Sequence, residues 1–171
     1  TTPPLTAVRA VKPQVINAVL AEVAPRMPGS AAVVSVAAGT TIANLARHFP
    51  SGQPIIRTIP NTPAAIGRGI TVCVANGNVS DDQKDSATAL LDACGEVAWI
   101  EDEEMMDAVT AVSGSGPAYV FLLAECMAEA GVAAGLPANL AAQLARATVS
   151  GAGELLYRED LDPATLRKNV T

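Results

Sequence analysis

Few residues in this sequence are suited to acid–base catalysis or metal binding. The 171 residues include one histidine, His48, and three scattered cysteines, which form no CxxC pair. Histidine-based triads and zinc sites therefore lack ligands, so we expect no metal. An odd number of separated cysteines also argues against a disulfide framework. We expect the thiols to act as small hydrophobes in a reducing compartment.

Positive charge and long apolar runs are also scarce. Eleven Lys and Arg face 17 Asp and Glu, giving a net charge of -6. Without a basic stripe, nucleic acid is not an expected partner. Glu125 and Glu129 interrupt the longest apolar run before it reaches the roughly 18 residues of a membrane span, and no signal peptide is evident. We therefore expect a soluble, cytoplasmic protein that does not bind a membrane.

Half of the residues are hydrophobic, and the first hundred alternate between strand-like and helix-like stretches. Short apolar runs without polar alternation are typical of buried strands in α/β proteins. A Ser-Asp-Asp sequence at residue 80 is a helix start signal. The pattern predicts strands at 7–11, 31–38, 54–59, 70–75 and 96–100, and helices at 14–27, 40–49 and 80–94. This order favours an α/β fold with part of a Rossmann-type parallel sheet.

From Met105 onward only helical patterns occur. We therefore predict two domains, a partial dinucleotide-binding domain over residues 1–102 and an all-helical domain over 103–171. The stretch from Tyr119 to Ala134 is apolar around most of its circumference, as in helices buried at an interface. We expect this helix to form a dimer, which a charge at Leu122 should break.

Four motifs together resemble pyrroline-5-carboxylate reductase in order and spacing: Ala10-Val11-Lys12-Pro13-Gln14, Ala37-Ala38-Gly39-Thr40-Thr41-Ile42, Pro60-Asn61-Thr62-Pro63 and Ala111-Val112-Ser113-Gly114-Ser115-Gly116-Pro117-Ala118-Tyr119. The resemblance implies a Rossmann-type domain followed by a helical dimerisation domain, in a homodimer or higher homo-oligomer. It also implies that NADPH or NADH reduces 1-pyrroline-5-carboxylate to L-proline, the last step of proline biosynthesis. In that family a Gly-rich phosphate loop precedes the first motif and a Ser-Pro-Gly-Gly-Thr loop follows the counterpart of Thr171. These 171 residues contain neither.

Three predicted strand ends carry candidate cofactor-binding residues, because open α/β sheets bind ligands at the carboxyl ends of their strands. By position alone they also fit a solvated lysine, plain backbone packing and an Asx turn. The resemblance favours contact with the cofactor. The candidates are Ala10, Val11, Lys12, Pro13, Val36, Ala37, Ala38, Asn61 and Thr62.

Ser113 and Ser115 are the candidate substrate-facing residues. The GxSxG spacing of a serine nucleophile is absent and no histidine is placed to activate either serine. Near a helix start they could face an anion, or they could mark an ordinary break between helices. The resemblance places this segment near the active site, and it also places Glu103 near the substrate and Asn169 near the cofactor.

Other interpretations remain open. Glu125 and Glu129 lie one helical turn apart, but a solvated or interface role is commoner for such a pair than catalysis. Strand–helix repeats followed by helices also occur in other Rossmann-type oxidoreductases, and a fold does not fix a substrate. A non-catalytic oligomerisation fragment is a further alternative.

Overall fold

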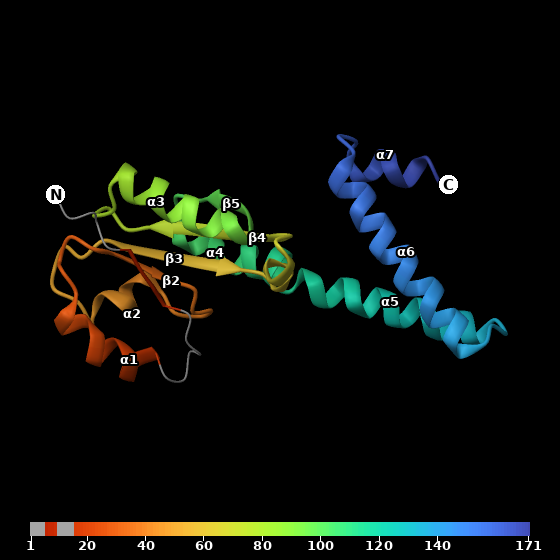
Figure 1. The fold of residues 1–171 in the computed structure, drawn as a ribbon, viewed down its shortest axis with the longest axis horizontal. Helices are drawn as coiled ribbons and strands as arrows, with labels where there is room; N and C mark the ends of the chain where they lie inside the picture. Colours follow the sequence, from red (N-terminus) through yellow and green to blue (C-terminus); the bar gives the residue numbers. More distant parts are fainter. Residues whose placement is uncertain (1–5, 10–15) are drawn as a thin grey trace. The chain divides into compact units, whose positions relative to one another are not determined.

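The computed structural model describes residues 6–9 and 16–171 (Figure 1). The chain divides into two compact units, Thr1–Pro117 and Ala118–Thr171, which are described separately below. The predicted turn at Ala10–Pro13 lies outside the described residues. The division falls after Pro117 because residues 103–114 pack against the sheet of the first unit.

Five strands form one sheet whose spatial order follows the chain. β1, β2 and β3 are parallel, β4 is antiparallel to β3, and β5 is parallel to β4. The strands are β1 (Thr6–Arg9), β2 (Ala32–Ser35), β3 (Ile55–Pro60), β4 (Gly69–Ala75) and β5 (Gly95–Trp99). The predicted strands and the α/β class are confirmed.

The expected all-parallel sheet is wrong at one step, between β3 and β4. Only residues 61–68 connect these strands, as a short 3₁₀ helix, η3 (Thr62–Ile66). A parallel connection needs a crossover of about a dozen residues or more, so this short link makes β4 turn back. The carboxyl ends of β1 to β3 therefore lie at the edge of the sheet where β4 and β5 begin.

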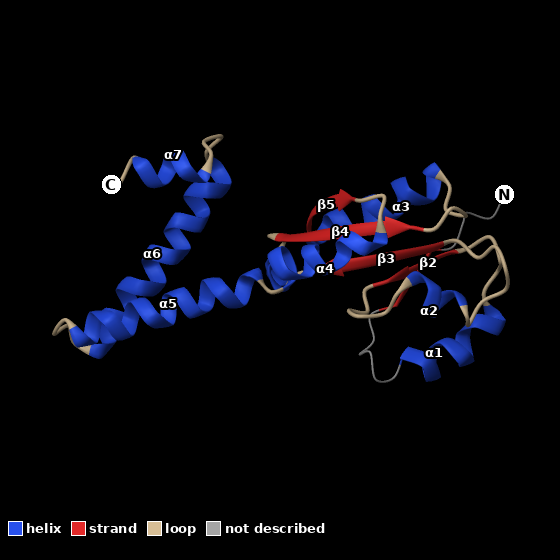
Figure 2. Ribbon diagram, turned by 180° about the vertical axis from the view of Figure 1, so that it is seen from behind, coloured by secondary structure: helices blue, strands red, loops and turns tan. Residues whose placement is uncertain are grey.

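Helices cover both faces of the sheet, as Figure 2 shows from behind. α1 (Ile16–Val23) and α2 (Ile42–Ala46) pack on one face, where Leu20 and Leu45 contact a cluster with Val33 and Ile55. α3 (Asp81–Leu91) packs on the other face, where its residues Ala87 and Leu91 form a cluster with strand residues. The strand residues of this cluster are Ala32, Val34, Ile56 and Cys73. Adjacent strand residues point to opposite faces, which accounts for the two separate clusters.

A third cluster extends the α2 face toward the carboxyl end of β3. Met106, at the start of α4 (Met106–Val109), is fully buried against Ile59 and Val74. Ile42 of α2 packs against both this cluster and the α1–α2 cluster. The first turn of α2 is thus held between the two halves of the core on this face.

The second unit contains three helices, α5 (Gly116–Ala133), α6 (Ala138–Arg158) and α7 (Pro163–Lys168). The first two residues of α5 belong to the first unit. α5 and α6 form a helical hairpin whose turn is closed by Gly135 at φ +100° and by a 3.0 Å hydrogen bond from the Leu136 N–H to the Gly131 carbonyl. A Cβ on Gly131 would lie 3.0 Å from the Ala141 Cβ, so glycine permits this close helix contact.

The continuous helical stretch Glu103–Ala133 is long and apolar enough to meet a length and composition test for a membrane span, with a mean hydropathy of 1.2 in its best window. The expectation that no segment approaches the length of a membrane span was wrong on this point, because it rested on uninterrupted apolar runs, whereas the expectation that the protein does not bind a membrane stays a prediction. None of that window is buried within the chain. A helix of this kind needs another apolar surface, either a second protein chain or a lipid.

Candidate active site at the ends of three parallel strands

The ends of β1, β2 and β3 lie side by side. Ser35, the last residue of β2, is paired in register with Arg9 of β1 and with Arg57 of β3. β1 and β2 therefore end at the same level, and β3 continues past them to Pro60. This geometry brings two predicted turns, Val36–Ala38 and Asn61–Thr62, to one edge of the sheet.

The turn after β2 is held at its start by hydrogen bonds to Ser35, and small residues follow. The Thr58 hydroxyl donates to the Ser35 carbonyl at 3.1 Å, and the Ala37 N–H donates to the Ser35 hydroxyl at 3.3 Å. Ala37 is buried whereas Ala38 is exposed. Gly39 follows with φ +74°, a conformation that glycine adopts without strain. A flat ring could approach this backbone closely.

The turn after β3 is stabilised by the side chain of Asn61. Its Oδ1 accepts a 3.0 Å hydrogen bond from the Ile70 N–H and so closes the connection to β4. Thr62 is exposed beside it. A Cβ on Gly69 would lie 2.7 Å from backbone atoms of Ala64, which explains why this connection contains glycine. Asn61 thus has a structural role in the turn, and its contact with a cofactor stays a prediction.

The serine-rich segment contains a turn of π-helix, Thr110–Gly114, labelled η6. The Ser115 N–H donates to the Thr110 carbonyl at 2.8 Å, and the Ser113 hydroxyl donates to the Val109 carbonyl at 3.0 Å. A Cβ on Gly114 would lie 3.8 Å from a methyl group of Ile59. The segment therefore packs beside the end of β3, close to the Asn61 turn.

Sequence reasoning foresaw a helix break at this segment but not its π geometry. π-turns occur mostly as single insertions in helices, frequently at functional sites. No simple sequence signal marks such a turn. Its position at the strand ends agrees with a substrate-facing role for Ser113 and Ser115, which remains a prediction.

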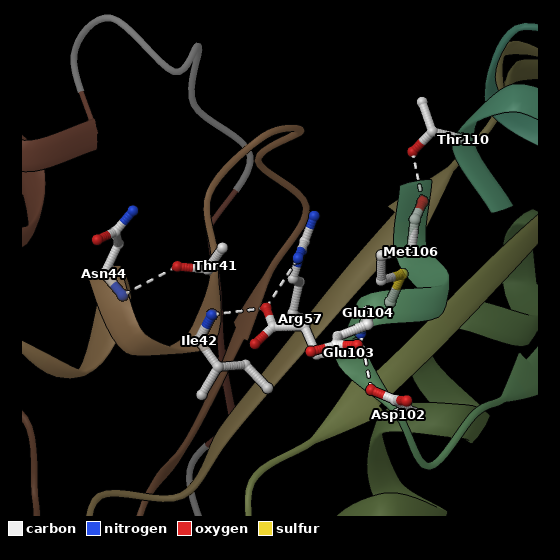
Figure 3. Close-up of polar contacts among 9 residues, drawn as sticks. All are labelled: Thr41, Ile42, Asn44, Arg57, Asp102, Glu103, Glu104, Met106 and Thr110. Carbon is white, nitrogen blue, oxygen red and sulfur yellow. Dashed lines mark hydrogen bonds and ion pairs between the residues drawn. The ribbon is translucent and has the colours of Figure 1, made fainter. Parts of the chain in front are cut away.

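Glu103 lies at the start of η5 (Glu103–Met105) and points toward β3 and α2, as Figure 3 shows. Its Oε1 accepts hydrogen bonds from Arg57 Nη1 and from the Ile42 N–H, both at 2.8 Å. The Arg57 side chain is only 7% exposed and that of Glu103 is 29% exposed. The carboxylate thus bridges the sheet and the amino-terminal end of α2.

Arg57 was missed by sequence reasoning, although a signal was present. It is a charged residue within an otherwise mostly apolar strand, Ile55–Pro60, that is buried over nearly its whole length. A buried charge calls for a partner, and that requirement could have directed attention to Arg57. Asn169 follows α7 in the second unit, where it is exposed, and the geometry of the first unit does not test its predicted role.

The opposite edge of the sheet carries a hollow of about 390 Å³, where β4 and β5 end. Its lining includes Lys84, Trp99 and Glu101, and the Lys84 ammonium lies 5.9 Å from the centre of the Trp99 ring. No predicted site residue lines this hollow. Within residues 6–9 and 16–171, no group of three or more metal-ligating side chains occurs.

The residues at the β1–β3 edge are compatible with a dinucleotide. Small exposed residues at Ala38 and Gly39 leave the backbone open to a planar ring beside the buried Ala37, and Thr62 is exposed. The edge also has the direction expected of dinucleotide-binding sheets, whose ligands lie beyond the carboxyl ends of parallel strands.

Comparison with known proteins agrees with this geometry. Residues 103–171 match the family model described as pyrroline-5-carboxylate reductase dimerisation. A curated pyrroline-5-carboxylate reductase from Pseudomonas aeruginosa is 42% identical over 164 residues, which cover 96% of this chain and 60% of that protein. The chain thus spans about three fifths of the length of this relative.

Solved structures show the same likeness. A pyrroline-5-carboxylate reductase from Coxiella burnetii superposes with a TM-score of 0.90 at 35% identity, over 97% of this chain and 62% of that one. The Plasmodium falciparum pyrroline carboxylate reductase with NADP bound gives a TM-score of 0.81 at 34% identity, over 96% and 65%. The likeness to pyrroline-5-carboxylate reductases thus covers almost all of this chain in both sequence and structure.

Proposed function

We propose that the complete protein reduces 1-pyrroline-5-carboxylate to L-proline with NADPH or NADH, the last step of proline biosynthesis. The observation that carries the proposal is the 42% identity to a pyrroline-5-carboxylate reductase along 96% of this chain. The NADP in the Plasmodium falciparum structure supports the choice of cofactor class. The parallel strand ends, with small residues and a π-turn beside them, support the location of the site.

The cofactor, when bound, supplies a hydride to the carbon of the C=N bond. In the proposed arrangement Val36, Ala37 and Ala38 back the nicotinamide ring, while Asn61 and Thr62 hydrogen-bond the cofactor. Lys12, with its neighbours Ala10, Val11 and Pro13, meets ribose or phosphate oxygens, and Asn169 contributes a further polar contact.

Ser113 and Ser115 fix the substrate carboxylate through their hydroxyl groups, and the Ser113 hydroxyl turns away from the Val109 carbonyl to do so. The imine nitrogen takes or keeps one proton, so the ring gains one hydride and one proton in total. Because the chemistry resides in the cofactor, the main task of the protein is to hold two rings face to face.

The proposal includes a homodimer formed through the helical part of the chain. Support comes from the dimerisation family model and from the apolar side chains that α5 exposes, such as Phe121 and Leu122. The domain division proposed for this function is 1–102 for the cofactor and 103–171 for dimerisation and substrate. A cytoplasmic location is proposed as well, supported by the three cysteines, which are all free thiols.

The direct test is a turnover assay with the complete protein. We expect NADPH or NADH to be oxidised, followed by absorbance, only when 1-pyrroline-5-carboxylate is added, and proline to accumulate in equal amount. Ser113→Ala should raise the KM for the imine, whereas Ser86→Ala, a hydroxyl on α3, should leave it unchanged. Oxidation with other imines or carbonyl compounds alone would indicate a different oxidoreductase. No oxidation with any of them would favour a non-catalytic oligomerisation module.

A further inference from the structure

A buried arginine in the centre of the sheet has no role in the function proposed above. Arg57 lies in β3 with only 7% of its side chain exposed. Burying a charge is costly unless it is paired and hydrogen-bonded, and its Nε is buried without a partner among the described residues. A hydrophobic residue at this position would avoid that cost. The charge therefore calls for an explanation beyond packing.

The partner of Arg57 is Glu103, which connects three elements through one oxygen atom. Oε1 accepts from Arg57 Nη1 on β3 and from the Ile42 N–H on α2, each at 2.8 Å, while Glu103 itself belongs to η5 (Figure 3). In the sequence Glu103 lies 46 positions after Arg57 and 61 positions after Ile42. Hydrogen bonds to a charged group are shorter and stronger than neutral ones, so this carboxylate is a firm anchor.

The Ile42 N–H is one of the groups that a helix start leaves without an internal partner. In α2 the Thr41 hydroxyl accepts from the Asn44 N–H at 3.2 Å, and Glu103 accepts from Ile42. α2 spans only Ile42–Ala46, so these two bonds fix its first turn. The chain that enters this turn is the segment 36–41, which contains the predicted nicotinamide-facing residues.

The same region is also held by packing. The side chain of Ile42 contacts the cluster of Ile59, Val74 and Met106, on which the π-turn rests. The Glu103 bond and this packing together tie the turn after β2 to the segment that carries Ser113. A shift of Glu103 would therefore move the cofactor turn relative to the serines.

We propose that Glu103 and Arg57 are positioning residues, which hold the turn 36–41 in place for the nicotinamide ring through the Ile42 N–H. This inference rests on the proposed function and differs from the sequence-based expectation that Glu103 acts at the substrate. Oε1 already accepts two hydrogen bonds, one from Arg57 of β3 and one from Ile42 of α2. The role of Glu103 is thus exerted through α2.

The experiment compares Glu103→Ala with Glu104→Ala in the complete protein. Glu104 is the adjacent, exposed carboxylate of η5, and its side chain makes no described contact with α2. Hydrogen exchange of the Ile42 amide is measured without cofactor, and the Kd for NADPH by fluorescence titration. We expect Glu103→Ala to speed exchange and to raise the Kd about tenfold to a hundredfold, the range of a lost charge-assisted hydrogen bond. Glu104→Ala should change neither.

Two further variants refine the test. Glu103→Gln keeps an oxygen that can accept from Ile42, so it should retain most of the slow exchange and of the NADPH affinity. Arg57→Lys keeps the positive charge but loses the planar guanidinium group. Its Ile42 exchange rate and its Kd for NADPH should lie between those of the wild type and of Glu103→Ala. If Glu103→Ala does not fold, Glu103→Asp, which shortens the side chain by one methylene group, replaces it with the same expected direction.

The outcomes separate this inference from the proposed function. An unchanged NADPH Kd with a raised KM for the imine would overturn it, because Glu103 would then act at the substrate. Unchanged Ile42 exchange in Glu103→Ala would overturn it as well. A wild-type protein that binds NADPH but does not turn over the imine would contradict the proposed substrate and leave the positioning role supported. Failure of the wild type to bind NADPH would overturn the cofactor link itself.

Discussion

The two units of the chain bury their apolar residues in different ways. In the first unit large side chains such as Leu20, Leu45, Ile55 and Ile56 are at most 1% exposed. In the second, every residue of which is described, the only buried residues are Ala141 and Ala145. The same unit exposes 66% of Phe121 and more than half of Leu122 and Leu123. The first unit thus contains its own core, whereas the second needs another surface to complete one.

This difference also separates two kinds of function. The first unit holds a rigid edge of strand ends on which a cofactor site can be built. The second exposes many large apolar side chains on α5 and α6, among them Phe121, Leu122, Leu144 and Leu155, and such exposure is typical of an interaction surface. The dimerisation model that matches residues 103–171 agrees with this assignment.

The largest effect is expected for Leu122→Glu in the second unit. A carboxylate buried between two helices would lose its hydration without gaining a partner, so the dimer should dissociate completely at micromolar concentration. The measurement is size-exclusion chromatography with light scattering. Leu90→Glu, at a residue 48% exposed on α3 of the first unit, is the control and should stay dimeric. If Leu122→Glu were still a dimer, the exposed apolar side chains around Leu122 on α5 would not form the dimer interface.

Alkylation of the thiols provides a second measure of the same contrast. Cys126 lies one helical turn after Leu122 and is exposed within the chain, as is Cys94 in the first unit. We expect Cys94 to react at one rate in the dimer and in Leu122→Glu, and Cys126 to react faster once the dimer is broken. Equal reactivity of Cys126 in both proteins would place the interface elsewhere.

A core substitution should have an intermediate effect and should distinguish the units thermodynamically. Leu45→Ala removes a fully buried side chain and should cost about 2–5 kcal/mol of unfolding free energy. Leu144→Ala, at a residue 47% exposed on α6, should cost no more than about 1 kcal/mol in the Leu122→Glu monomer. In urea, the fluorescence of Trp99, the only tryptophan, reports unfolding of the first unit, and far-UV circular dichroism also follows the helices of the second. Equal costs for the two substitutions would contradict separate cores.

Above pH 9 a pH effect on stability should arise in the core of the first unit. Burial raises the pKa of the Cys73 thiol to about 12 from its usual value of 9. Above pH 9 the unfolded chain loses this proton while the folded chain keeps it, so stability falls as pH rises from 9 toward 12, by up to about 1.4 kcal/mol per pH unit. The urea midpoint of the wild type should fall more steeply between pH 9 and 10.5 than that of Cys73→Ala. If the urea midpoints of the two proteins fell equally with pH, the stability loss would not come from the Cys73 thiol.

The smallest effect is expected at α7. Hydrogen bonds from the Thr165 side chain and backbone, and from the Ala164 backbone, lower the pKa of Asp162, the residue that caps this helix. The cap therefore contributes above the ordinary carboxyl pKa and is lost as pH falls through the lowered value. Asp162→Ala should speed hydrogen exchange at Ala164 and Thr165 while leaving the Trp99 unfolding curve unchanged. Exchange that does not respond to the substitution would show that α7 is fixed by other contacts.

Most of the fold could be predicted because apolar runs report burial directly. The strands from Ala32 to Trp99 and the helix that starts after Ser80 all occur where the sequence places them. The Ser80 cap is made as its sequence indicates, and the Gln83 Oε1 accepts a 2.9 Å hydrogen bond from the Ser80 N–H. The direction of β4 was missed, although the short link between β3 and β4 determines it. Loop length between two runs therefore deserves as much weight as the runs themselves.

The candidate site was predictable only in outline. The strand ends at Ala38 and Asn61 follow from the general rule for α/β sheets, and the resemblance supplied Ser113 and Glu103. The π-turn depends on a single shifted hydrogen bond, from Ser115 to Thr110, for which no residue pattern is diagnostic. The contact between Glu103 and Arg57 joins residues 46 apart, and only the folded chain brings them together.

The proposed function and the positioning role of Glu103 both depend on where the nicotinamide ring binds. A crystal structure of the complete protein with NADPH tests this directly. We predict the ring against Ala37 and Ala38, with Ser113 within reach of a substrate placed on its other side. Density for the cofactor in the hollow of Lys84 and Trp99, or remote from both strand ends, would contradict the proposed site and the positioning role of Glu103 together.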